Sequence, residues 1–391
     1  MKEGVFGDLL ELQRGYDLPS SQMHGGVVPV AGSNGVIGFH DQVKATAPAI
    51  TIGRSGSVGK VHYYDKPIWP HNTALFVTDY KGNDPRYLYY LLQLVDFNQM
   101  TGSSVVPSLN RNIVHSTSIC YEENVVRQRE ISDVLSALDR KIALNRRKIA
   151  TLEKMAKEIY DYWFVQYDFP DANGRPYKSS GGEMVYSPEL KREIPKGWKV
   201  DALSSFCEVV NGATPSTSTI GNYGGDIVWI TPKDLSDQGQ KFIACGERCI
   251  TKLGYESCST HMIPKGSLLM SSRAPIGLLA MAACELCTNQ GFKNLVPNDM
   301  SDRFYLYYYL QSHMSQIEQL GSGTTFKEVS REAISKYPIL YVTDQMVRKR
   351  WVDFISPIFG RQMVLQDEVD RLTTLRDFLL PLLMNGQVKV G

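Results

Sequence analysis

Two nearly identical heptapeptides, YLYYLLQ at Tyr87–Gln93 and YLYYYLQ at Tyr305–Gln311, stand 218 residues apart and agree at six of seven positions. Further blocks repeat around them in the same order. The segment ITIGRSGSVG at 50–59 matches LLMSSRAPIG at 268–277 in character. A single matched heptapeptide can arise by chance, whereas several blocks in one order indicate an internal duplication.

The duplicated blocks also pair individual residues. The alignment sets Arg54 against Arg273 and Asn72 against Asn289. A last pair of blocks, at an offset of 220, is SSVVPSLNRNIVHSTSICY at 103–121 and GTTFKEVSREAISKYPILY at 323–341, which superposes Arg111 on Arg331.

The two copies differ mainly in one stretch. Gly15 to Arg54 spans 39 residues, whereas Gly212 to Arg273 spans 61. This is the pattern expected of two similar scaffolds that bind different targets. The alternative is an old duplication that has drifted in a loop.

Each copy is followed by a long predicted helix. The first helix begins after Asn124, a plausible N-cap, and carries apolar residues at alternating spacings of three and four, which is typical of a coiled coil. The seam positions are Leu135, Leu138, Ile142, Asn145, Ile149, Leu152, Ala156, Ile159 and Trp163. Adding 220 gives Ile355, Ile358, Gln362, Leu365, Val369, Leu372, Arg376, Leu379 and Leu383. Since proline interrupts helical hydrogen bonding, Pro357 should kink or break the second helix near its start and leave it less regular than the first.

Short β-branched runs separated by Gly-rich turns predict strands inside each copy, and the tyrosine-rich segments predict short helices whose rings face a core. Stacking of bases on these tyrosines is the alternative. The fold class is therefore α+β, with two similar mixed α/β domains and two long helices. The expected boundaries are 1–123 and 195–343 for the domains, 124–165 and 344–385 for the helices, and 166–194 for an exposed linker.

Composition bounds the function only loosely. A chain of 391 residues suits two or three domains. A net charge of +1 excludes binding by bulk positive charge, although local basic clusters can still contact phosphate. The N-terminal segment carries acids where a signal peptide would be apolar, and no apolar run reaches 18 residues, so we expect a cytoplasmic protein.

Five cysteines lie within 43 residues beside His261 and loosely resemble zinc ligands; they are Cys245, Cys249, Cys258, Cys284 and Cys287. Since Cys284 and Cys287 fall in a strand-like apolar run, we favour buried, inert thiols and expect no metal.

The familiar enzyme motifs are incomplete or absent in the sequence. Gly53–Lys60 resembles a phosphate-binding loop but has Arg54 where a glycine is required and Val61 where Ser or Thr is required. The chain carries no Asn/Asp-Pro-Pro-aromatic element of amino-methyltransferases, and Pro170-Asp171 lacks the Glu-x-Lys partner of metal-dependent nucleases. These features favour binding over catalysis, with an unfamiliar catalytic site in one copy as the alternative.

Taken with the paired helices, four motifs resemble the specificity subunit of type I restriction-modification systems over essentially the whole chain. They are GSSVVPSLNR at 102–111, IPKGW at 194–198, WITPKDL at 229–235 and LCTNQGFK at 286–293. The resemblance implies two target-recognition domains, each reading half of a split DNA sequence. It also implies antiparallel spacer helices, a pseudo-twofold repeat, and a location near the nucleoid.

The resemblance further implies that catalysis resides in partners. Two modification subunits would methylate adenine with S-adenosylmethionine, and restriction subunits could join for cleavage driven by ATP with Mg. This chain would itself hold no cofactor. A coiled-coil adaptor that bridges proteins without DNA readout is the alternative.

The spacing also suggests the target. Leu135 to Trp163 is 29 residues, roughly 43 Å of helix at about 1.5 Å per residue, close to one turn of B-DNA at about 34–36 Å. We therefore expect an unread gap of roughly 5–8 base pairs between the half-sites.

Base readout requires forked donors and amide side chains. The candidate DNA contacts in the first copy are Arg54, Ser55, Asn72 and Arg111, with Lys60 for phosphate. Those in the second copy are Lys233, Ser272, Arg273, Gln290 and Lys293, with Thr325 and Lys327 near the backbone. The recurring residues could instead tie the scaffold together, and the sequence leaves this open.

Overall fold

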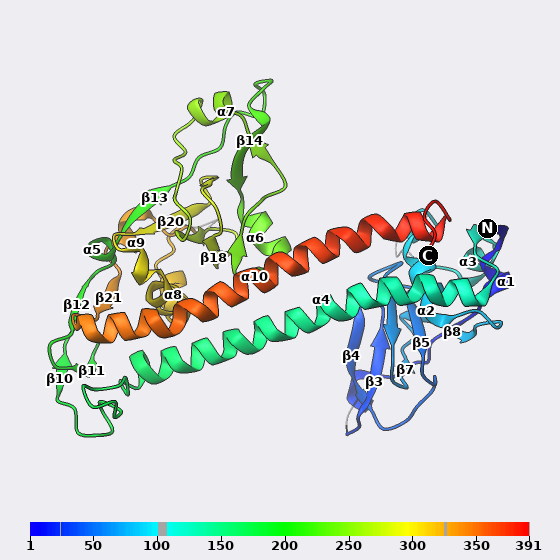
Figure 1. Cartoon of the computed structure of the whole chain (residues 1–391), viewed down its shortest axis with the longest axis horizontal. Helices are drawn as coiled ribbons and strands as arrows, with labels where there is room; N and C mark the ends of the chain where they lie inside the picture. The colour runs from blue at the N-terminus through cyan, green and yellow to red at the C-terminus, as the bar shows by residue number, and fades with distance from the viewer. Residues whose placement is uncertain (24, 101–107, 324–326, 391) are drawn as a thin grey trace. The chain divides into compact units, whose positions relative to one another are not determined.

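The computed structural model describes residues 1–23, 25–100, 108–323 and 327–390. They divide into a first unit, residues 1–145 and 368–391, and a second unit, residues 146–367. Each unit contains one globular copy and part of both long helices, α4 (Val125–Tyr160) and α10 (Gln345–Met384) (Figure 1).

The globular part of the first unit is built from nine strands and three α-helices in its described residues. They are β1 (Lys2–Val5), α1 (Phe6–Leu9), β2 (Glu11–Arg14), β3 (Val28–Gly32), β4 (Gly35–His40), β5 (Ala49–Gly53), β6 (Val61–Tyr64), β7 (Trp69–Pro70), β8 (Ala74–Asp79), α2 (Pro85–Gln93), α3 (Arg111–Ser116) and β9 (Ser118–Tyr121). Short 3-10 turns occupy Ser20–Gln22 and Phe97–Met100.

The second unit repeats this order with additions. Its elements are β10 (Met184–Ser187), β11 (Arg192–Pro195), β12 (Lys199–Ala202), α5 (Leu203–Phe206), β13 (Cys207–Asn211), β14 (Tyr223–Ile230), α6 (Pro232–Gln238), β15 (Phe242–Ile243), β16 (Cys249–Ile250), α7 (Lys252–Glu256), β17 (Leu268–Ser272), β18 (Ile276–Ala282), β19 (Cys287–Thr288), β20 (Phe292–Pro297), α8 (Arg303–Gln319), α9 (Arg331–Ser335) and β21 (Pro338–Tyr341), with a 3-10 turn at Met300–Asp302.

The sheets confirm the duplication strand by strand. The main sheet has the order β2-β8-β5-β6 in the first unit and β13-β20-β17-β18-β15 in the second. A smaller sheet pairs β3 with β4 and β7, and its counterpart pairs β14 with β16 and β19; the β3–β7 and β14–β19 pairs are parallel. Two fold-closing pairs, β1–β9 and β12–β21, complete the match.

The length difference between the copies is accounted for by inserted structure. In the first unit β3 turns directly into β4, whereas α6 and β15 stand between β14 and β16 in the second unit. Thr231 caps α6 by accepting a hydrogen bond from the backbone N–H of Asp234, whose carboxylate accepts one from the backbone N–H of Thr231. Such a capping box makes the insertion a defined element rather than a drifted loop.

The segment predicted as an exposed linker is partly folded instead. Strands β10 and β11 form a hairpin, and Phe169 is buried where it stacks on Trp198 with ring centroids 5.1 Å apart. Asp168 is also buried and accepts hydrogen bonds from the backbone N–H and hydroxyl of Ser179. The Gly, Pro and charged residues of this segment predict an exposed linker, but its few aromatic residues pack well enough to hold it in place.

The predicted seam is confirmed. None of its eighteen positions is classed as exposed, and Leu135, Ile142, Asn145 and Ala156 are buried in α4. Asn124 caps α4 as predicted, accepting a hydrogen bond from the backbone N–H of Val126 at 2.9 Å.

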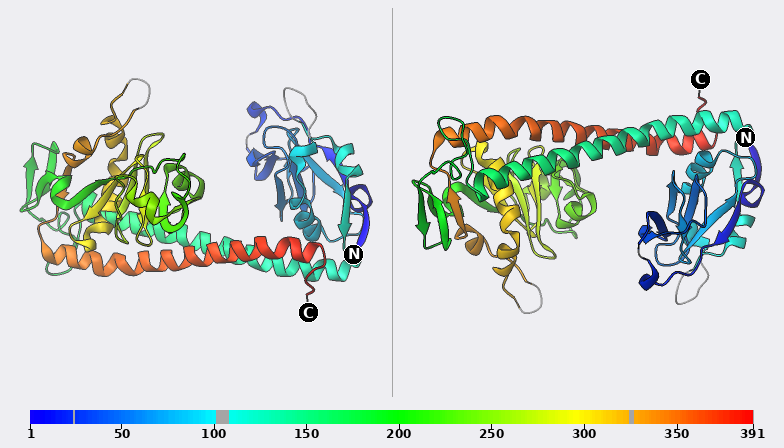
Figure 2. Two further views of the ribbon diagram at one scale, coloured as in Figure 1. Left: turned by 90° about the horizontal axis from the view of Figure 1, so that it is seen from above. Right: turned by 90° about the horizontal axis from the view of Figure 1, so that it is seen from below.

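Within each unit α4 and α10 lie side by side and antiparallel (Figure 2). In the first unit Asp139 of α4 pairs with Arg376 of α10 at 2.9 Å. In the second unit Gln362 of α10 donates a hydrogen bond to Glu153 of α4 at 2.8 Å. The polar seam residues therefore have partners on the facing helix, which fixes its register.

The break predicted at Pro357 does not occur. Helix α10 continues unbroken through Pro357 and Pro381, both of which are exposed. A proline on the solvent face leaves the freed carbonyl group where water can hydrogen-bond to it, so the helix need not end. The irregular turn lies instead in the first helix, whose end at Asp161–Val165 is a π-helix.

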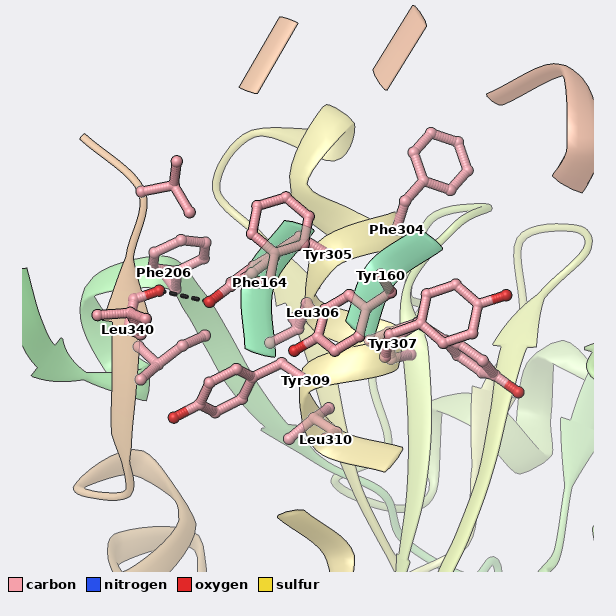
Figure 3. Packing of buried hydrophobic residues seen from close by; sticks show 14 of the residues in the cluster. Tyr160, Phe164, Phe206, Phe304, Tyr305, Leu306, Tyr307, Tyr309, Leu310 and Leu340 are labelled. Atoms are coloured by element: carbon pink, nitrogen blue, oxygen red, sulfur yellow. Dashed lines mark hydrogen bonds between the residues drawn. The ribbon is translucent and has the colours of Figure 1, made fainter. Parts of the chain in front are cut away.

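The tyrosine-rich helices α2 and α8 pack into cores, as predicted. All seven residues from Phe304 to Leu310 are buried (Figure 3). Tyr305 donates a hydrogen bond to the backbone oxygen of Leu340 at 2.6 Å, and Tyr309 donates one to that of Pro338 at 2.9 Å. Rings so enclosed do not offer a stacking platform for bases.

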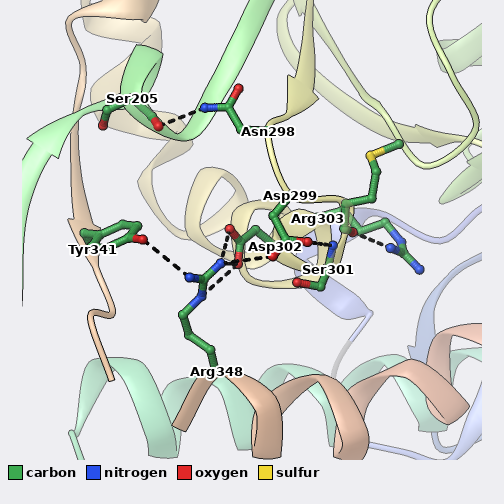
Figure 4. Close-up of polar contacts among 9 residues, drawn as sticks. Ser205, Asn298, Asp299, Ser301, Asp302, Arg303, Tyr341 and Arg348 are labelled. Atoms are coloured by element: carbon green, nitrogen blue, oxygen red, sulfur yellow. Dashed lines mark hydrogen bonds and ion pairs between the residues drawn. The ribbon is translucent and has the colours of Figure 1, made fainter. Parts of the chain in front are cut away.

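Polar contacts fix the tyrosine helix of each unit against a long helix. In the second unit Arg348 of α10 holds both carboxylate oxygens of Asp302 at 2.6 Å (Figure 4). At the corresponding place in the first unit, Gln128 of α4 donates a hydrogen bond to the side chain of Asn83 at 2.8 Å and accepts one from the backbone N–H of Asp84.

A buried lysine joins the inserted segment to the long helices of the second unit. The Lys241 ammonium group lies 2.7 Å from Glu153, 3.0 Å from the Tyr308 hydroxyl and 3.1 Å from Gln362. It also lies 3.4 Å from the centre of the Phe359 ring. Burial lowers the pKa of Lys241 to about 8 although Glu153 acts to raise it. The surroundings thus oppose the charge, and Glu153 compensates only part of that cost.

None of the helices in the described ranges is apolar over a stretch long enough to cross a membrane.

We predict that Glu153→Gln lowers the free energy of unfolding of the second unit by about 3 kcal/mol, because it leaves the Lys241 ammonium group buried without its countercharge. Adding Lys241→Met should restore much of this loss. Urea denaturation followed by tryptophan fluorescence measures it, since Trp163, Trp198, Trp229 and Trp351 all lie in the second unit.

Glu158→Gln is the matched control, because Glu158 lies on the same helix with its side chain 63% exposed. If Glu153→Gln and Glu158→Gln gave the same small effect, the buried pair would have no structural role.

Candidate nucleic-acid interface

Three chain segments meet at one end of the main sheet in each unit. In the first unit the backbone N–H of Arg54, just after β5, donates to the oxygen of Thr73 at 2.8 Å, and the N–H of Leu109 donates to the oxygen of Arg54 at 2.9 Å. In the second unit Ser272 bonds to Gly291 at 2.7 Å, and Val329 bonds to Ser272 at 3.0 Å, in the same pattern. These bonds assemble residues that are far apart in sequence at one surface.

The same hydrogen bonds correct two pairings made from the sequence. Strand β5 pairs Gly53 with Ala74, and β17 pairs Ser271 with Phe292, which is one uniform offset of 218. By this register Arg54 corresponds to Ser272, not to Arg273. The sequence alignment had matched identical residue types, whereas the strand pairing sets the true correspondence.

This register relates six of the twelve candidate contacts in pairs. Ser55 corresponds to Arg273 and Asn72 corresponds to Gln290, not to Asn289. Arg111 and Arg331 remain matched, since each is the first residue of a short helix capped by Asn110 or Ser330.

A glycine occupies the same place beside the candidate residues in both units, where the chain passes close to a facing backbone. A Cβ atom on Gly15 would lie 2.1 Å from the backbone oxygen of His71, and one on Gly212 would lie 2.1 Å from that of Asn289. No side chain fits at such a distance, so the segment after β2 or β13 can approach the turn only through glycine.

In the first unit the candidate residues are partly tied to their surroundings. Asn72 donates a hydrogen bond to the carboxylate of Asp17. Lys60 is exposed and donates to the side chain of Asn34 at 2.7 Å. Arg111 is exposed, with only a long contact of 3.4 Å to the backbone oxygen of Leu12. Arg111 and Lys60 are therefore exposed enough to meet a phosphate.

In the second unit a charged cluster forms around Glu328. Lys293 is buried and its ammonium group lies 3.0 Å from the Glu328 carboxylate. Ser272, also fully buried, lies 3.4 Å from Lys293 and donates to the backbone oxygen of Gly291 at 3.2 Å. Arg273 lies 3.9 Å from Glu328 with its side chain 39% exposed. Of the three candidates here, Arg273 is the one that reaches the surface.

An open pocket of about 350 Å³ adjoins this cluster. Polar side chains line it throughout, and they are those of Asn211, Lys293, Ser322, Glu328, Ser330 and Arg331. Sequence reasoning had proposed Lys293 but missed Asn211, Glu328 and Arg331 as site residues. Arg331 could have been found, because it is the counterpart of Arg111.

The remaining candidates lie around the same unit. Gln290 accepts a hydrogen bond from the Thr214 hydroxyl, and both residues are exposed. Lys233 is on the inserted helix α6, 2.8 Å from Glu247, and this hydrogen bond raises the pKa of Lys233. Lys327 is exposed, whereas Thr325 lies outside the described residues.

The cysteines do not form one class. Cys287 and Cys207 are buried, and burial raises the pKa of each thiol to about 12. Of the five cysteines expected to be buried, only Cys287 is; Cys245 is exposed, and Cys249, Cys258 and Cys284 are half-buried. Within the described ranges no group of three or more His, Cys, Asp or Glu side chains is arranged to hold a metal ion.

A duplicated domain with a shared framework, an unequal inserted stretch and polar residues gathered at one end of its sheet defines a two-domain recognition protein. Residues 1–154 and 195–361 both match the family model described as the type I restriction modification DNA specificity domain. The chain belongs to this family, and membership does not favour the alternative of an adaptor without DNA readout. The family is one of specificity subunits, which are not catalytic.

Similar proteins are in line with this family assignment. The chain is 26% identical over 361 residues to the specificity subunit of the type I restriction enzyme HindI from Haemophilus influenzae, covering 78% of this chain and 77% of that protein. It is 41% identical over 159 residues to the MjaIX specificity subunit of Methanocaldococcus jannaschii, covering 40% of this chain and only 37% of that subunit. The crystal structure of the S subunit from M. genitalium has the same fold, with a TM-score of 0.65 at 14% identity over 98% of this chain and 96% of that one.

We predict that Arg273→Ala weakens DNA binding about tenfold or more without changing the melting temperature, because a half-exposed forked donor can contact a base or phosphate. Ser272→Ala should do the reverse, lowering stability by about 1 kcal/mol through the loss of a buried hydrogen bond. Fluorescence anisotropy with labelled duplex and calorimetry separate the two effects. A loss of folding in Arg273→Ala would instead assign Arg273 to the scaffold.

Proposed function

We propose that this chain is the non-catalytic DNA-recognition subunit of a type I restriction-modification complex and that it recognises a bipartite, asymmetric sequence. The observation that carries the proposal is the repeated specificity domain, whose strand framework recurs in both units while the stretch between β3 and β5 differs from that between β14 and β17. Equal frameworks support equal placement on DNA, and unequal stretches support unequal half-sites.

The long helices support a fixed spacing between the half-sites. Helix α4 has 36 residues and α10 has 40, each without a break. At about 1.5 Å per residue, α4 alone is about 54 Å long, which exceeds one turn of B-DNA. If the half-sites lie one turn of DNA apart, the unread gap between them is roughly 5–8 base pairs.

Catalysis and cofactors belong to partners in this proposal. Two modification subunits supply S-adenosylmethionine-dependent adenine methylation, and two restriction subunits supply ATP- and Mg-dependent cleavage where the system cleaves. The proposed setting is the cytoplasm, close to the nucleoid. The supporting observation is chemical: the pocket at the end of the second unit's main sheet is lined by amide, hydroxyl, cationic and carboxylate side chains, which suit hydrogen bonding to a ligand.

Mapping of N6-methyladenine in a genome that carries this system tests the proposal. We expect one motif in two halves separated by unread base pairs, with a methylated adenine in each half. A continuous motif, or methylation that persists unchanged after deletion of this chain, would refute the proposal.

The spacing is tested by lengthening both helices at the chain boundaries of the two units, between Asn145 and Arg146 and between Asp367 and Glu368. Asn145 and Glu368 face each other at 2.8 Å, so four residues inserted at each point keep the helices paired. Four residues add about 6 Å of helix, so the gap should grow by about one to two base pairs while both half-sites stay the same. Inserting four alanines after Gly239, in the exposed turn that follows α6, is the control that should leave the gap unchanged.

A further inference from the structure

The second unit carries an ion pair between a buried lysine and a partly exposed glutamate where the first unit has uncharged residues. The strand register places Lys293 at the position of Leu75. The equivalent backbone bonds from Leu109 to Arg54 and from Val329 to Ser272 place the preceding residue, Glu328, at the position of Ser108. Both positions belong to the shared framework, not to the inserted stretch. The framework itself has therefore diverged at this point.

The pair is held from several sides. Lys293 is 6% exposed and contacts the Oε1 atom of Glu328 at 3.0 Å. The Ser272 hydroxyl lies 3.5 Å from the same oxygen. Arg273 lies 3.9 Å from the other oxygen, Oε2, which is beyond hydrogen-bond length. An ionised carboxylate accepts about four hydrogen bonds, so Oε2 keeps acceptor capacity.

Stability alone does not account for such a pair. Replacing a buried ion pair with apolar residues of similar size is often neutral or stabilising. Leu75 in the first unit shows that an apolar side chain suits this strand position. The pair thus calls for another explanation.

The pocket beside the pair indicates what the carboxylate can bind. It is open, holds about 350 Å³ and is lined by polar groups from β13, from β20 and from the segment that leads into α9. Glu328 has 39% of its side chain exposed there. A carboxylate at the surface repels phosphate and accepts from amino groups. On DNA edges the amino groups in the major groove are N4 of cytosine and N6 of adenine.

We propose that Glu328 is a specificity determinant that accepts a hydrogen bond from an exocyclic amino group, cytosine N4 or adenine N6, at one base pair of the half-site read by the second unit. Lys293 positions the carboxylate from below, and Arg331 at the pocket wall meets the adjacent phosphate. The inference rests on the proposed function and names one of its reading residues.

The test transfers the first unit's residues to the second. The double variant Lys293→Leu with Glu328→Ser leaves no unpaired charge, and the first unit shows that this pair of residue types fits the framework. In the assembled complex it should lose discrimination at one base pair by about tenfold or more, while the other half-site and the gap are unchanged. The single variant Glu328→Gln, nearly the same shape, should alter preference at the same base pair.

The readouts are N6-methyladenine mapping and competition binding with duplexes varied at each base pair in turn. The control double variant Lys336→Leu with Glu332→Ser removes an exposed ion pair of 2.6 Å on α9 and should leave the recognised sequence unchanged.

Three outcomes overturn the inference. They are unaltered discrimination in both Glu328 variants, a shift equal to that of the Lys336 and Glu332 control, or a uniform loss of affinity for all sequences with folding intact. Failure of the proposed function would look different, because the unmodified complex would then show no split motif at all.

Discussion

In each unit one carboxylate of α4, Asp139 in the first and Glu153 in the second, links α4 to the tyrosine-rich helix and to α10. The placement of each recognition domain on the long helices depends on this link. In the first unit Tyr90 of α2 donates to Asp139 at 2.5 Å, and Asp139 pairs with Arg376 of α10. In the second unit Tyr308 of α8 donates to Glu153 at 3.2 Å, and Glu153 accepts from Gln362 of α10. Burial and the neighbouring carboxylate raise the pKa of both tyrosines, so each hydroxyl stays a donor at any physiological pH. In a low-dielectric setting such bonds are strong and directional.

A second constraint separates what is kept from what may change. The close approach of Gly15 and Gly212 to the facing backbone admits no side chain, and the hydrogen bonds of Arg54 and Ser272 are made by backbone atoms. Backbone bonds tolerate any side chain, so Arg54 and Ser272 can occupy the same place with different chemistry. The framework therefore supports divergence of the reading residues without loss of the fold. This is how one scaffold can serve two half-sites.

The periodic features were predictable from the sequence, and the pairwise ones were not. The seam from Leu135 to Trp163 and the buried tyrosines of α8 follow from regular spacing, which a single chain displays directly. The match of Arg54 to Ser272 depends on strand register, and identical residue types one position away misled the alignment. The Lys293–Glu328 pair joins residues 35 apart through a fold that spacing does not reveal. The prediction of a break at Pro357 failed for another reason, because the effect of a proline depends on whether it lies on the buried or the solvent-exposed face of the helix.

The charge pair also shows where specificity can arise in a duplicated protein. A buried lysine costs desolvation, and Lys293 is offset chiefly by Glu328. Lys241 repeats the arrangement with Glu153, but there the carboxylate joins α4 to the inserted stretch and the role is mechanical. At Glu328 the carboxylate faces an open pocket, not a helix. The same chemistry thus fixes structure where side chains of α8 and α10 also bind the carboxylate, as at Glu153, and becomes available for recognition where the carboxylate lines a pocket, as at Glu328.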